Sequence, residues 1–219
     1  MIRAVLLDMD GTVLDTERIN KICWQRAMAE TGYHFEEKVY FDLIGLNDKS
    51  MSQYFADNFG FTQEQFDQMK ISGYNYSRAY KAEHGVPVKQ GFTELSDYLR
   101  QQNIKTAAVT SSTCLEARHN FQGAGIEDRF DLIIGGDSVT SGKPSPEPYQ
   151  KAAEALGLQP SECLAAEDSA NGVRSAHAAG IKCVYIKDIA DIPAEAKALA
   201  DYEANTLDEL IKIIGDLNR

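Results

Sequence analysis

Short apolar runs alternate with longer amphipathic segments over most of the chain. The apolar runs lie at residues 2–7, 105–109, 131–135, 162–166 and 181–186. Runs that are apolar on both faces are typical of parallel strands whose sheet is covered on both sides. Because helix-length segments separate them, we predict an α/β fold with a doubly wound parallel sheet.

The last segment, residues 206–217, has the features of an amphipathic helix. Thr206 and Glu209 have the spacing of a capping box, which predicts that the helix begins at Thr206. The apolar residues at helical spacing are Leu207, Leu210, Ile211, Ile214 and Leu217. We expect this stripe to pack against the sheet.

Residues 16–87 break the alternation, because helical stretches follow one another there without a convincing strand. The stretches lie at residues 17–32, 48–60 and 62–85. The sequence "GVPVKQG" then has the glycine and proline that suit a return to the core. We therefore predict a core formed by residues 1–15 and 88–219, with a helical domain inserted at 16–87.

Charge and composition narrow the class of protein. The 22 basic and 33 acidic residues give a net charge of −11, which makes nucleic acids and anionic membranes poor partners. An anionic small molecule would need a local positive site. No run reaches the roughly 18 apolar residues of a membrane span, and the 4 cysteines lack metal-ligand spacing. We expect a cytoplasmic protein with reduced thiols, and the sequence leaves its oligomeric state open.

Two aspartates, Asp8 and Asp10, stand one residue apart where the first apolar run ends. At the end of a buried strand, repulsion and lost hydration of two like charges cost free energy. A carboxylate there is a candidate nucleophile toward a phosphoryl group. Two unit charges about 4 Å apart repel by about 4 kcal/mol at an effective dielectric of about 20, so a phosphate could approach only beside a cation.

Four segments together resemble the signatures of the haloacid dehalogenase-like hydrolase superfamily, in its order and over nearly the whole chain. They are "DMDGT" at residues 8–12, Thr110 in "AAVTSS", Lys143 in "GKPSPEPY", and Glu167 and Asp168 in "EDSANGVRSAHAAG". The helical insertion after the first segment resembles the cap of this superfamily. Within it, the chain looks most like the branch of β-phosphoglucomutase, phosphoglycolate phosphatases and sugar-phosphate phosphatases.

The resemblance implies a Rossmann-like core with an α-helical cap that closes over the site. It also implies a Mg²⁺-dependent phosphatase that hydrolyses a sugar phosphate or a similar small phosphomonoester through an aspartyl phosphate. Asp8 would be the nucleophile, and Asp10 would serve as the general acid and base.

The remaining residues of the four segments acquire roles from the same resemblance. Mg²⁺ would be bound by Asp8, the main-chain carbonyl of Asp10, and Asp168. The phosphate group would be held by Thr110, Ser111 and Lys143.

Supporting residues and substrate-selecting residues are further expectations. We expect the hydroxyl of Thr12 to bond within its own turn and Glu167 to support the cation indirectly. In this superfamily the cap selects the substrate, so the candidates for selection are Asn20, Asn47, Asp48 and Lys49. The sequence does not reveal which phosphorylated compound they accept.

Two alternatives to a phosphatase stay open. A β-phosphoglucomutase-like phosphomutase is the rival enzyme, but its cap histidine and arginine align with Asn20 and Asp48, which favours hydrolysis. Lys49 is adjacent and could replace the arginine after a one-residue shift. A receiver-type phospho-acceptor module is the rival from another class, and it leaves the helical insertion and Asp10 without a role. A dehalogenase would leave the second aspartate and the cation site unexplained.

Overall fold

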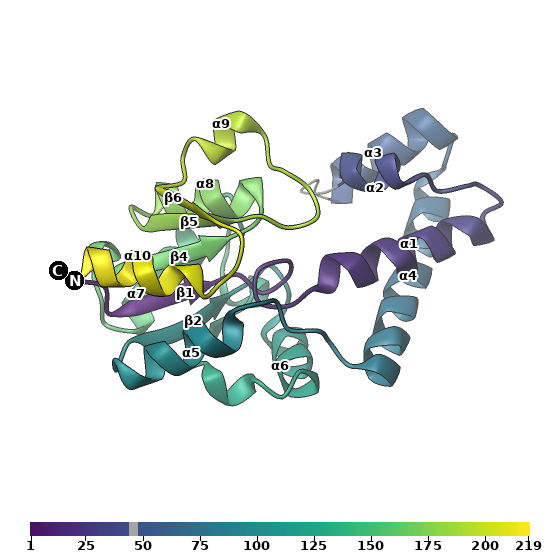
Figure 1. The fold of residues 1–219 in the computed structure, drawn as a ribbon. Coiled ribbons are helices and arrows are strands. Elements are labelled where there is room, and N and C mark those ends of the chain that lie inside the picture. Colours follow the sequence, from purple (N-terminus) through teal and green to yellow (C-terminus); the bar gives the residue numbers. More distant parts are fainter. Residues whose placement is uncertain (44–47) are drawn as a thin grey trace. The chain divides into compact units, whose positions relative to one another are not determined.

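The computed structural model describes residues 1–43 and 48–219, apart from the side chains of Phe41 and Asp48. The chain forms two compact units (Figure 1). The first unit comprises Met1–Asp15 and Val86–Arg219, and the second comprises Thr16–Gly85. The boundary at which we expected the chain to return to the core lies two residues later, at 87/88.

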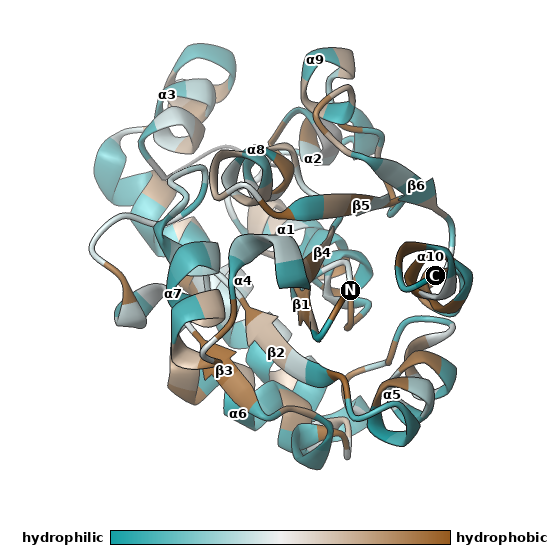
Figure 2. Cartoon of the chain, turned by 90° about the vertical axis from the view of Figure 1, so that its left-hand side faces the viewer, coloured by the Kyte–Doolittle hydropathy of each residue, from teal (hydrophilic) through white to brown (hydrophobic). Residues whose placement is uncertain are grey.

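A parallel sheet of six strands forms the centre of the first unit, in the order β3-β2-β1-β4-β5-β6 (Figure 2). The strands are β1 (Ala4–Leu7), β2 (Lys105–Val109), β3 (Leu132–Ile134), β4 (Cys163–Glu167), β5 (Lys182–Ile186) and β6 (Tyr202–Ala204). The predicted α/β class and parallel sheet are confirmed. We missed β6 because it is a three-residue strand with an exposed glutamate at its centre and therefore lacks an apolar run.

Helices cover both faces of this sheet, which is why its strands are apolar on both sides (Figure 2). One face packs against α5 (Phe92–Gln101), α6 (Cys114–Gly123) and α10 (Glu209–Leu217). The other packs against α7 (Glu147–Ala155) and α8 (Ala170–Ala178). Short α9 (Ala194–Lys197) and 3₁₀ turns at Glu127–Arg129, Gly136–Ser138 and Pro160–Glu162 complete the unit.

The start of α10 differs from the prediction. The helix begins at Glu209, after Asp208, and the predicted capping box at Thr206 is wrong. The hydroxyl of Thr206 donates to Glu209 Oε1 at 3.4 Å, and the intervening residues form a turn. Leu207, Leu210 and Ile214 are nevertheless fully buried in the core, so the predicted apolar stripe is confirmed.

The second unit is helical, with α1 (Thr16–Glu30), α2 (Glu37–Leu43), α3 (Asp48–Phe59) and α4 (Gln63–His84). Three of these helices match the predicted stretches, whereas α2 was not expected. α4 begins with a capping box between Thr62 and Gln65 and ends at Gly85. Phe55 lies at the centre of an aromatic core and stacks with the ring of Trp24.

The two chain segments that border the second unit pair with each other inside the first unit. Asp15 N donates to Pro87 O at 2.9 Å, and Lys89 N donates to Val13 O at 2.8 Å. Leu14 and Val88 form an antiparallel bridge between them. Backbone hydrogen bonds therefore tie Lys89 to the loop that follows β1.

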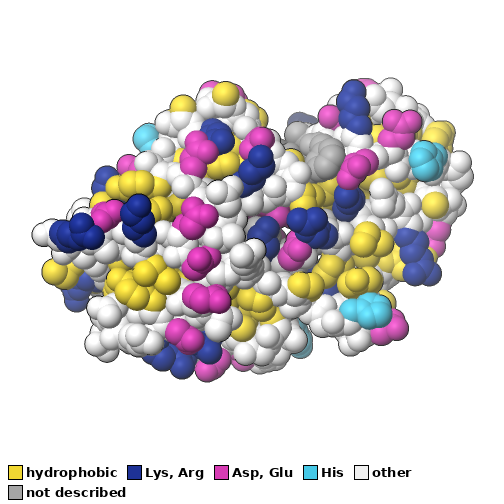
Figure 3. All heavy atoms as spheres, in the orientation of Figure 1, with side chains coloured by type: hydrophobic (Ala, Val, Ile, Leu, Met, Phe, Trp, Pro, Cys, Tyr) yellow, Lys and Arg dark blue, Asp and Glu magenta, His cyan; other side chains and the backbone are white. Residues whose placement is uncertain are grey.

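On the face drawn in Figure 3, acidic and basic side chains are interspersed among apolar ones. Among the helices that the structure describes, none combines the length and the apolar character needed to cross a bilayer.

Candidate active site

Three of the four sequence segments reach one edge of the sheet. Asp8 follows β1, Thr110 follows β2, and Asp168 follows β4. Because β1 pairs in parallel register with both β2 and β4, the carboxyl ends of these strands meet. The strand order also reverses between β1 and β4, which is where open α/β sheets bind their ligands.

The turn after β1 brings the acidic groups together. Met9 is buried in the core, and Gly11 has a left-handed φ of 82°. Gly11 N donates to Leu14 O at 2.8 Å, which closes the turn. A Cβ atom at Gly11 would lie 2.3 Å from Asp168 Oδ2, so the absence of a side chain allows this carboxylate to approach the turn.

Lys143 joins the first and last segments. Its Nζ lies 2.5 Å from Asp8 Oδ1 and 2.5 Å from Glu167 Oε1, and it donates to Val109 O at 2.8 Å. The side chain of Lys143 is 5% exposed. Burial opposes its charge, but the attraction of Asp8 and Glu167 prevails and raises the pKa of Lys143 above its usual range. Lys143 is therefore a buried ammonium held between two carboxylates.

The carboxyl groups of the site outnumber the single ammonium of Lys143. Burial, aided by the repulsion of Glu167, raises the pKa of Asp8 well above its usual range despite the attraction of Lys143. Burial and the charges of Asp8 and Glu167 also raise the pKa of Asp168. A further cation would relieve this repulsion.

The residues present fit a hard metal ion. Asp8, Glu167 and Asp168 each place a carboxylate oxygen within 4.8 Å of the others. Oxygen ligands of this kind suit Mg²⁺ or Ca²⁺. Glu167 is already engaged by protein donors, so Asp8 and Asp168 are the better ligands.

Glu167 is fully buried and accepts hydrogen bonds from side chains that we did not identify from the sequence. Its Oε1 accepts from the hydroxyl of Tyr149 at 2.7 Å, and its Oε2 accepts from Ser169 Oγ at 3.1 Å. The tyrosine belongs to the "KPSPEPY" segment, which is the signal that could have identified it. A Cβ atom at Gly172 would lie 1.9 Å from Glu167 Cδ, so the first turn of α8 packs directly against this carboxylate.

The loop after β2, with Thr110, Ser111 and Ser112, also borders the site. Thr110 is buried, and its Oγ1 accepts from Ser112 N at 3.0 Å. Ser111 is exposed. Ser112, which sequence reasoning missed, donates from Oγ to Asp10 Oδ2 at 3.3 Å. The loop after β2 therefore contacts the second aspartate of the first segment.

We expected the hydroxyl of Thr12 to bond within its own turn, and this prediction is wrong. The hydroxyl donates to Asp168 Oδ1 at 2.7 Å. The prediction failed because Asp168 is brought beside the turn by the pairing of β1 with β4. Thr12 is fully buried and thus orients one oxygen of the candidate metal ligand.

The candidates for substrate selection lie in the second unit or outside the described residues. Asn20, on α1, accepts from Ser77 Oγ at 3.1 Å. Lys49, on α3, is exposed. The side chain of Asp48 and all of Asn47 lie outside the part that the structure describes.

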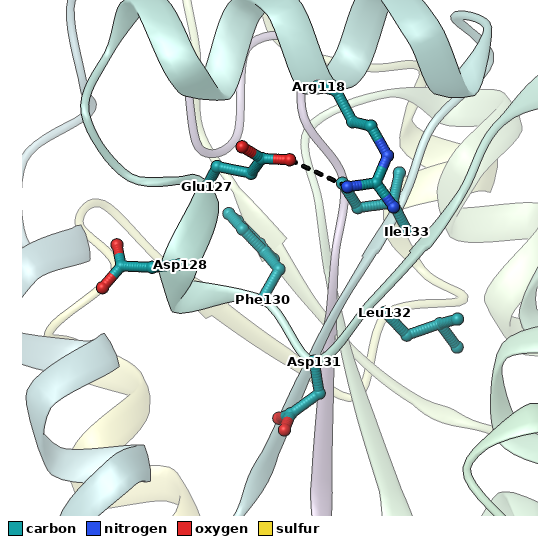
Figure 4. A pocket seen from close by; sticks show the side chains of 7 residues that line it. All are labelled: Arg118, Glu127, Asp128, Phe130, Asp131, Leu132 and Ile133. Atoms are coloured by element: carbon teal, nitrogen blue, oxygen red, sulfur yellow. Dashed lines mark hydrogen bonds and ion pairs between the residues drawn. The ribbon is translucent and has the colours of Figure 1, made fainter.

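A separate pocket lies beside the edge strand β3 (Figure 4). Its charged residues are paired, because Arg118 bonds Glu127 at 2.8 Å and Lys105 bonds Asp131 at 2.9 Å. Asp131 precedes β3, at the opposite end of the strands from Asp8. None of the residues from the four sequence segments lines this pocket.

Known proteins resemble the chain along most of its length. A validoxylamine A 7'-phosphate phosphatase from Streptomyces hygroscopicus subsp. limoneus is 30% identical over 211 residues, which cover 96% of each chain. A phosphorylated carbohydrates phosphatase from Thermotoga maritima is 27% identical over 182 residues, which cover 83% of each chain. The crystal structure of CbbY from Rhodobacter sphaeroides in complex with phosphate has a TM-score of 0.80 and 26% identity, and the match covers 96% of each chain.

The sequence model of the haloacid dehalogenase-like hydrolase family matches residues 5–186. This span contains all four sequence segments on which the resemblance rested. Together with a phosphatase that aligns along nearly the whole chain, it confirms the prediction that this protein belongs to the haloacid dehalogenase-like hydrolase family.

Proposed function

We propose that the protein is a Mg²⁺-dependent phosphatase that hydrolyses a sugar phosphate or a similar small phosphomonoester through an aspartyl phosphate on Asp8. The observation that carries this proposal is the meeting of Asp8, Asp168 and the buried Lys143 at the carboxyl edge of the sheet. The activities for which the two phosphatases described above are named support a phosphorylated carbohydrate as the class of substrate.

The reaction divides into two displacements. In the first, a carboxylate oxygen of Asp8 bonds to phosphorus, the bond from phosphorus to the leaving oxygen breaks, and Asp10 donates a proton to that oxygen. In the second, Asp10 takes a proton from water while the water oxygen bonds to phosphorus. The bond between phosphorus and Asp8 then breaks, and inorganic phosphate leaves.

The surrounding side chains support these steps. The hydrogen bond from Ser112 orients Asp10. Lys143 fixes Asp8 Oδ1 and keeps a positive charge beside the transferred group. Thr110 Oγ1 accepts from the main chain, which leaves its hydroxyl hydrogen to donate to a phosphate oxygen, and Ser111 is exposed beside it.

The metal site is proposed on Asp8, Asp168 and the main-chain carbonyl of Asp10. A bound Mg²⁺ would neutralise the carboxylates and attract the phosphate oxygens. Thr12 holds Asp168 Oδ1 in place for this purpose. Glu167 keeps Lys143 in position and acts on the metal only indirectly.

Substrate selection is proposed for the second unit, with Asn20, Asn47, Asp48 and Lys49 as the candidates. The carboxamide of Asn20 is engaged by Ser77 and has no titratable proton, which favours hydrolysis over the phosphomutase alternative. A receiver-type module is disfavoured because it gives the helical second unit and Asp10 no role.

We further propose that the protein works in the cytoplasm on a small molecule, without nucleic acid or membrane partners. The unpaired cysteines Cys23, Cys163 and Cys183 are buried, which suits a reducing compartment. The net charge of −11 disfavours anionic polymers and membrane surfaces.

The proposal is tested by a screen of phosphorylated metabolites that measures release of inorganic phosphate. We expect activity with Mg²⁺, loss of activity with a chelator, recovery with Mg²⁺, and poor recovery with Ca²⁺ because Ca²⁺ favours higher coordination numbers. Asp8→Asn should abolish turnover while the thermal midpoint shows a folded protein. Full activity in metal-free protein, or near-normal turnover by Asp8→Asn, would contradict the mechanism. A phosphate retained on Asp8 without turnover would favour the receiver-type alternative.

A further inference from the structure

Asp188 and Lys89 form a largely buried ion pair beside the site. Asp188 follows β5, and Lys89 lies in the segment that pairs with the loop after β1. Lys89 Nζ donates to Asp188 Oδ1 at 2.5 Å. The side chain of Asp188 is 4% exposed and that of Lys89 is 15% exposed. Neither residue belongs to the four sequence segments, and no step proposed above uses them.

The second oxygen of Asp188 has no protein partner. Asp188 Oδ2 is buried, and no hydrogen-bond donor among the described residues reaches it. Buried carboxylate oxygens are normally hydrogen-bonded, because an acceptor without a donor loses its hydration and gains nothing in return. This oxygen therefore points to a donor that the protein itself does not supply.

Asp188 Oδ2 lies close to Asp168, one of the candidate metal ligands. A Cβ atom at Gly11 would lie 3.1 Å from Asp188 Oδ2 and 2.3 Å from Asp168 Oδ2. These distances keep the two oxygens close enough for one water molecule to bridge them through two hydrogen bonds of about 2.8 Å. The charge of Asp188 also contributes to the raised pKa of Asp168, as expected for neighbours.

We propose that Asp188 is a positioning residue of the metal centre, whose Oδ2 accepts a hydrogen bond from a water molecule bound to the cation held by Asp8 and Asp168. Mg²⁺ keeps several of its waters in protein sites, and acceptors in the outer shell orient those waters. Lys89 occupies Oδ1, so Oδ2 is the oxygen that is left for this water. This inference rests on the metal centre of the proposed function.

The test measures binding of Mg²⁺ to the metal-free full-length protein by titration calorimetry. We expect Asp188→Asn to weaken Mg²⁺ binding about tenfold or more, as loss of an outer-shell partner does in other metal sites. Asp191→Asn is the matched control, because Asp191 lies three positions further on, is 57% exposed and pairs with Lys187 at 3.4 Å. This control removes one negative charge from the same segment and should leave Mg²⁺ binding unchanged.

Lys89→Met separates the metal role from a merely structural one, because it breaks the ion pair but keeps the Asp188 carboxylate. We expect this variant to lose thermal stability in chelator yet to retain Mg²⁺ binding. Asp188→Glu keeps the charge and shifts the acceptor, so it should also weaken binding; it serves as the test variant if Asp188→Asn fails to fold.

The outcomes are distinguishable. Wild-type affinity in folded Asp188→Asn would overturn the inference, and so would equal weakening in Asp188→Asn and Lys89→Met, since that result assigns the effect to the pair alone. If the wild-type protein itself binds no Mg²⁺, the metal centre of the proposed function fails, and the inference fails with it.

Discussion

The hydroxyl of Tyr149 donates a 2.7 Å hydrogen bond to Glu167 Oε1, the same oxygen that accepts from Lys143. Tyr149 and Glu167 are both fully buried, and burial together with the charge of Glu167 raises the pKa of Tyr149 well above its usual range. Tyr149 therefore stays a neutral donor. It connects α7 to the end of β4 and holds the carboxylate that anchors Lys143 near the proposed nucleophile.

Replacing Tyr149 by Phe removes this donor but keeps the ring. We expect Tyr149→Phe to lower the free energy of unfolding by about 2 kcal/mol, because a buried carboxylate loses one of its hydrogen bonds. Tyr185→Phe is the matched control, since Tyr185 is also buried but makes a longer bond, 3.4 Å, to the carbonyl of Ala190. Urea unfolding of the metal-free proteins measures both. An equal loss in the two variants would show that Tyr149 has no special link to Glu167.

Replacing Gly172 or Gly215 by alanine should change the free energy of unfolding in opposite directions. Gly172→Ala would place a methyl group 1.9 Å from Glu167 Cδ, so we expect destabilisation of about 3 kcal/mol and weaker phosphatase activity. Gly215 lies in α10 with no atom near its would-be Cβ, so Gly215→Ala should stabilise the protein by about 0.5–1 kcal/mol. Urea unfolding measures both changes in stability. A stable, fully active Gly172→Ala would contradict the packing argument.

Asp10→Asn tests the proposed general acid. We expect kcat for an alkyl phosphate to fall by about 10²–10⁴, because the departing alkoxide no longer receives a proton. With p-nitrophenyl phosphate, whose leaving group departs without a proton, the first displacement should be much less affected. The burst of p-nitrophenol and the steady-state rate of phosphate release report the two displacements separately. An equal loss in the first displacement with both substrates would remove Asp10 from the role of acid.

The stability contribution of Asp131 should depend on pH. Burial alone would raise its pKa, but hydrogen bonds from Thr106 N and Lys105 Nζ, each 2.9 Å, prevail and lower the pKa. A lowered pKa in the folded state gives stability that is present above the ordinary value of about 4 and is lost as the pH falls through the folded-state pKa.

We therefore expect Asp131→Asn to be less stable than the wild type at pH 7 and the difference to fade in acid. Thermal unfolding between neutral and acidic pH measures it. Asp128→Asn is the control, because Asp128 lines the same pocket (Figure 4). Asp128 is 74% exposed, and its 3.5 Å contact with Arg100 is an exposed ion pair. If the stability difference between Asp131→Asn and the wild type grew as the pH fell, the argument for a lowered pKa of Asp131 would be wrong.

The products formed from one substrate distinguish a phosphatase from a phosphomutase. With β-glucose 1-phosphate and a trace of the bisphosphate, we expect inorganic phosphate rather than glucose 6-phosphate. The reason is that Asn20 supplies no titratable proton and is bonded to Ser77. Rapid isomerisation with little free phosphate would show that the Asn20 argument is wrong. Asn20→Ala, which keeps the position untitratable, should not change the product.

Local patterns in the sequence were sufficient for the class of the fold. The apolar runs that became β1, β2, β3, β4 and β5 are visible because a strand covered on both faces must be apolar on both faces. Asp8 is visible for a related reason, since a carboxylate directly after such a run is conspicuous. Short elements escaped this reasoning. The three residues of β6 form no apolar run, and the seven residues of α2 are too few to show a helical period. Thr206 has the spacing of a capping box without starting a helix.

Only the tertiary structure decided which side chains meet around the proposed site. The bond from Thr12 to Asp168, the bond from Tyr149 to Glu167 and the pairing of Lys89 with Asp188 each join residues from different elements. Such contacts are set by the pairing of β1 with β4 and of β4 with β5, and by the packing of α7 against the sheet, which place distant positions side by side. A residue's own neighbours in the sequence carry no record of these partners, because hydrogen bonds and charge interactions depend on distance in space.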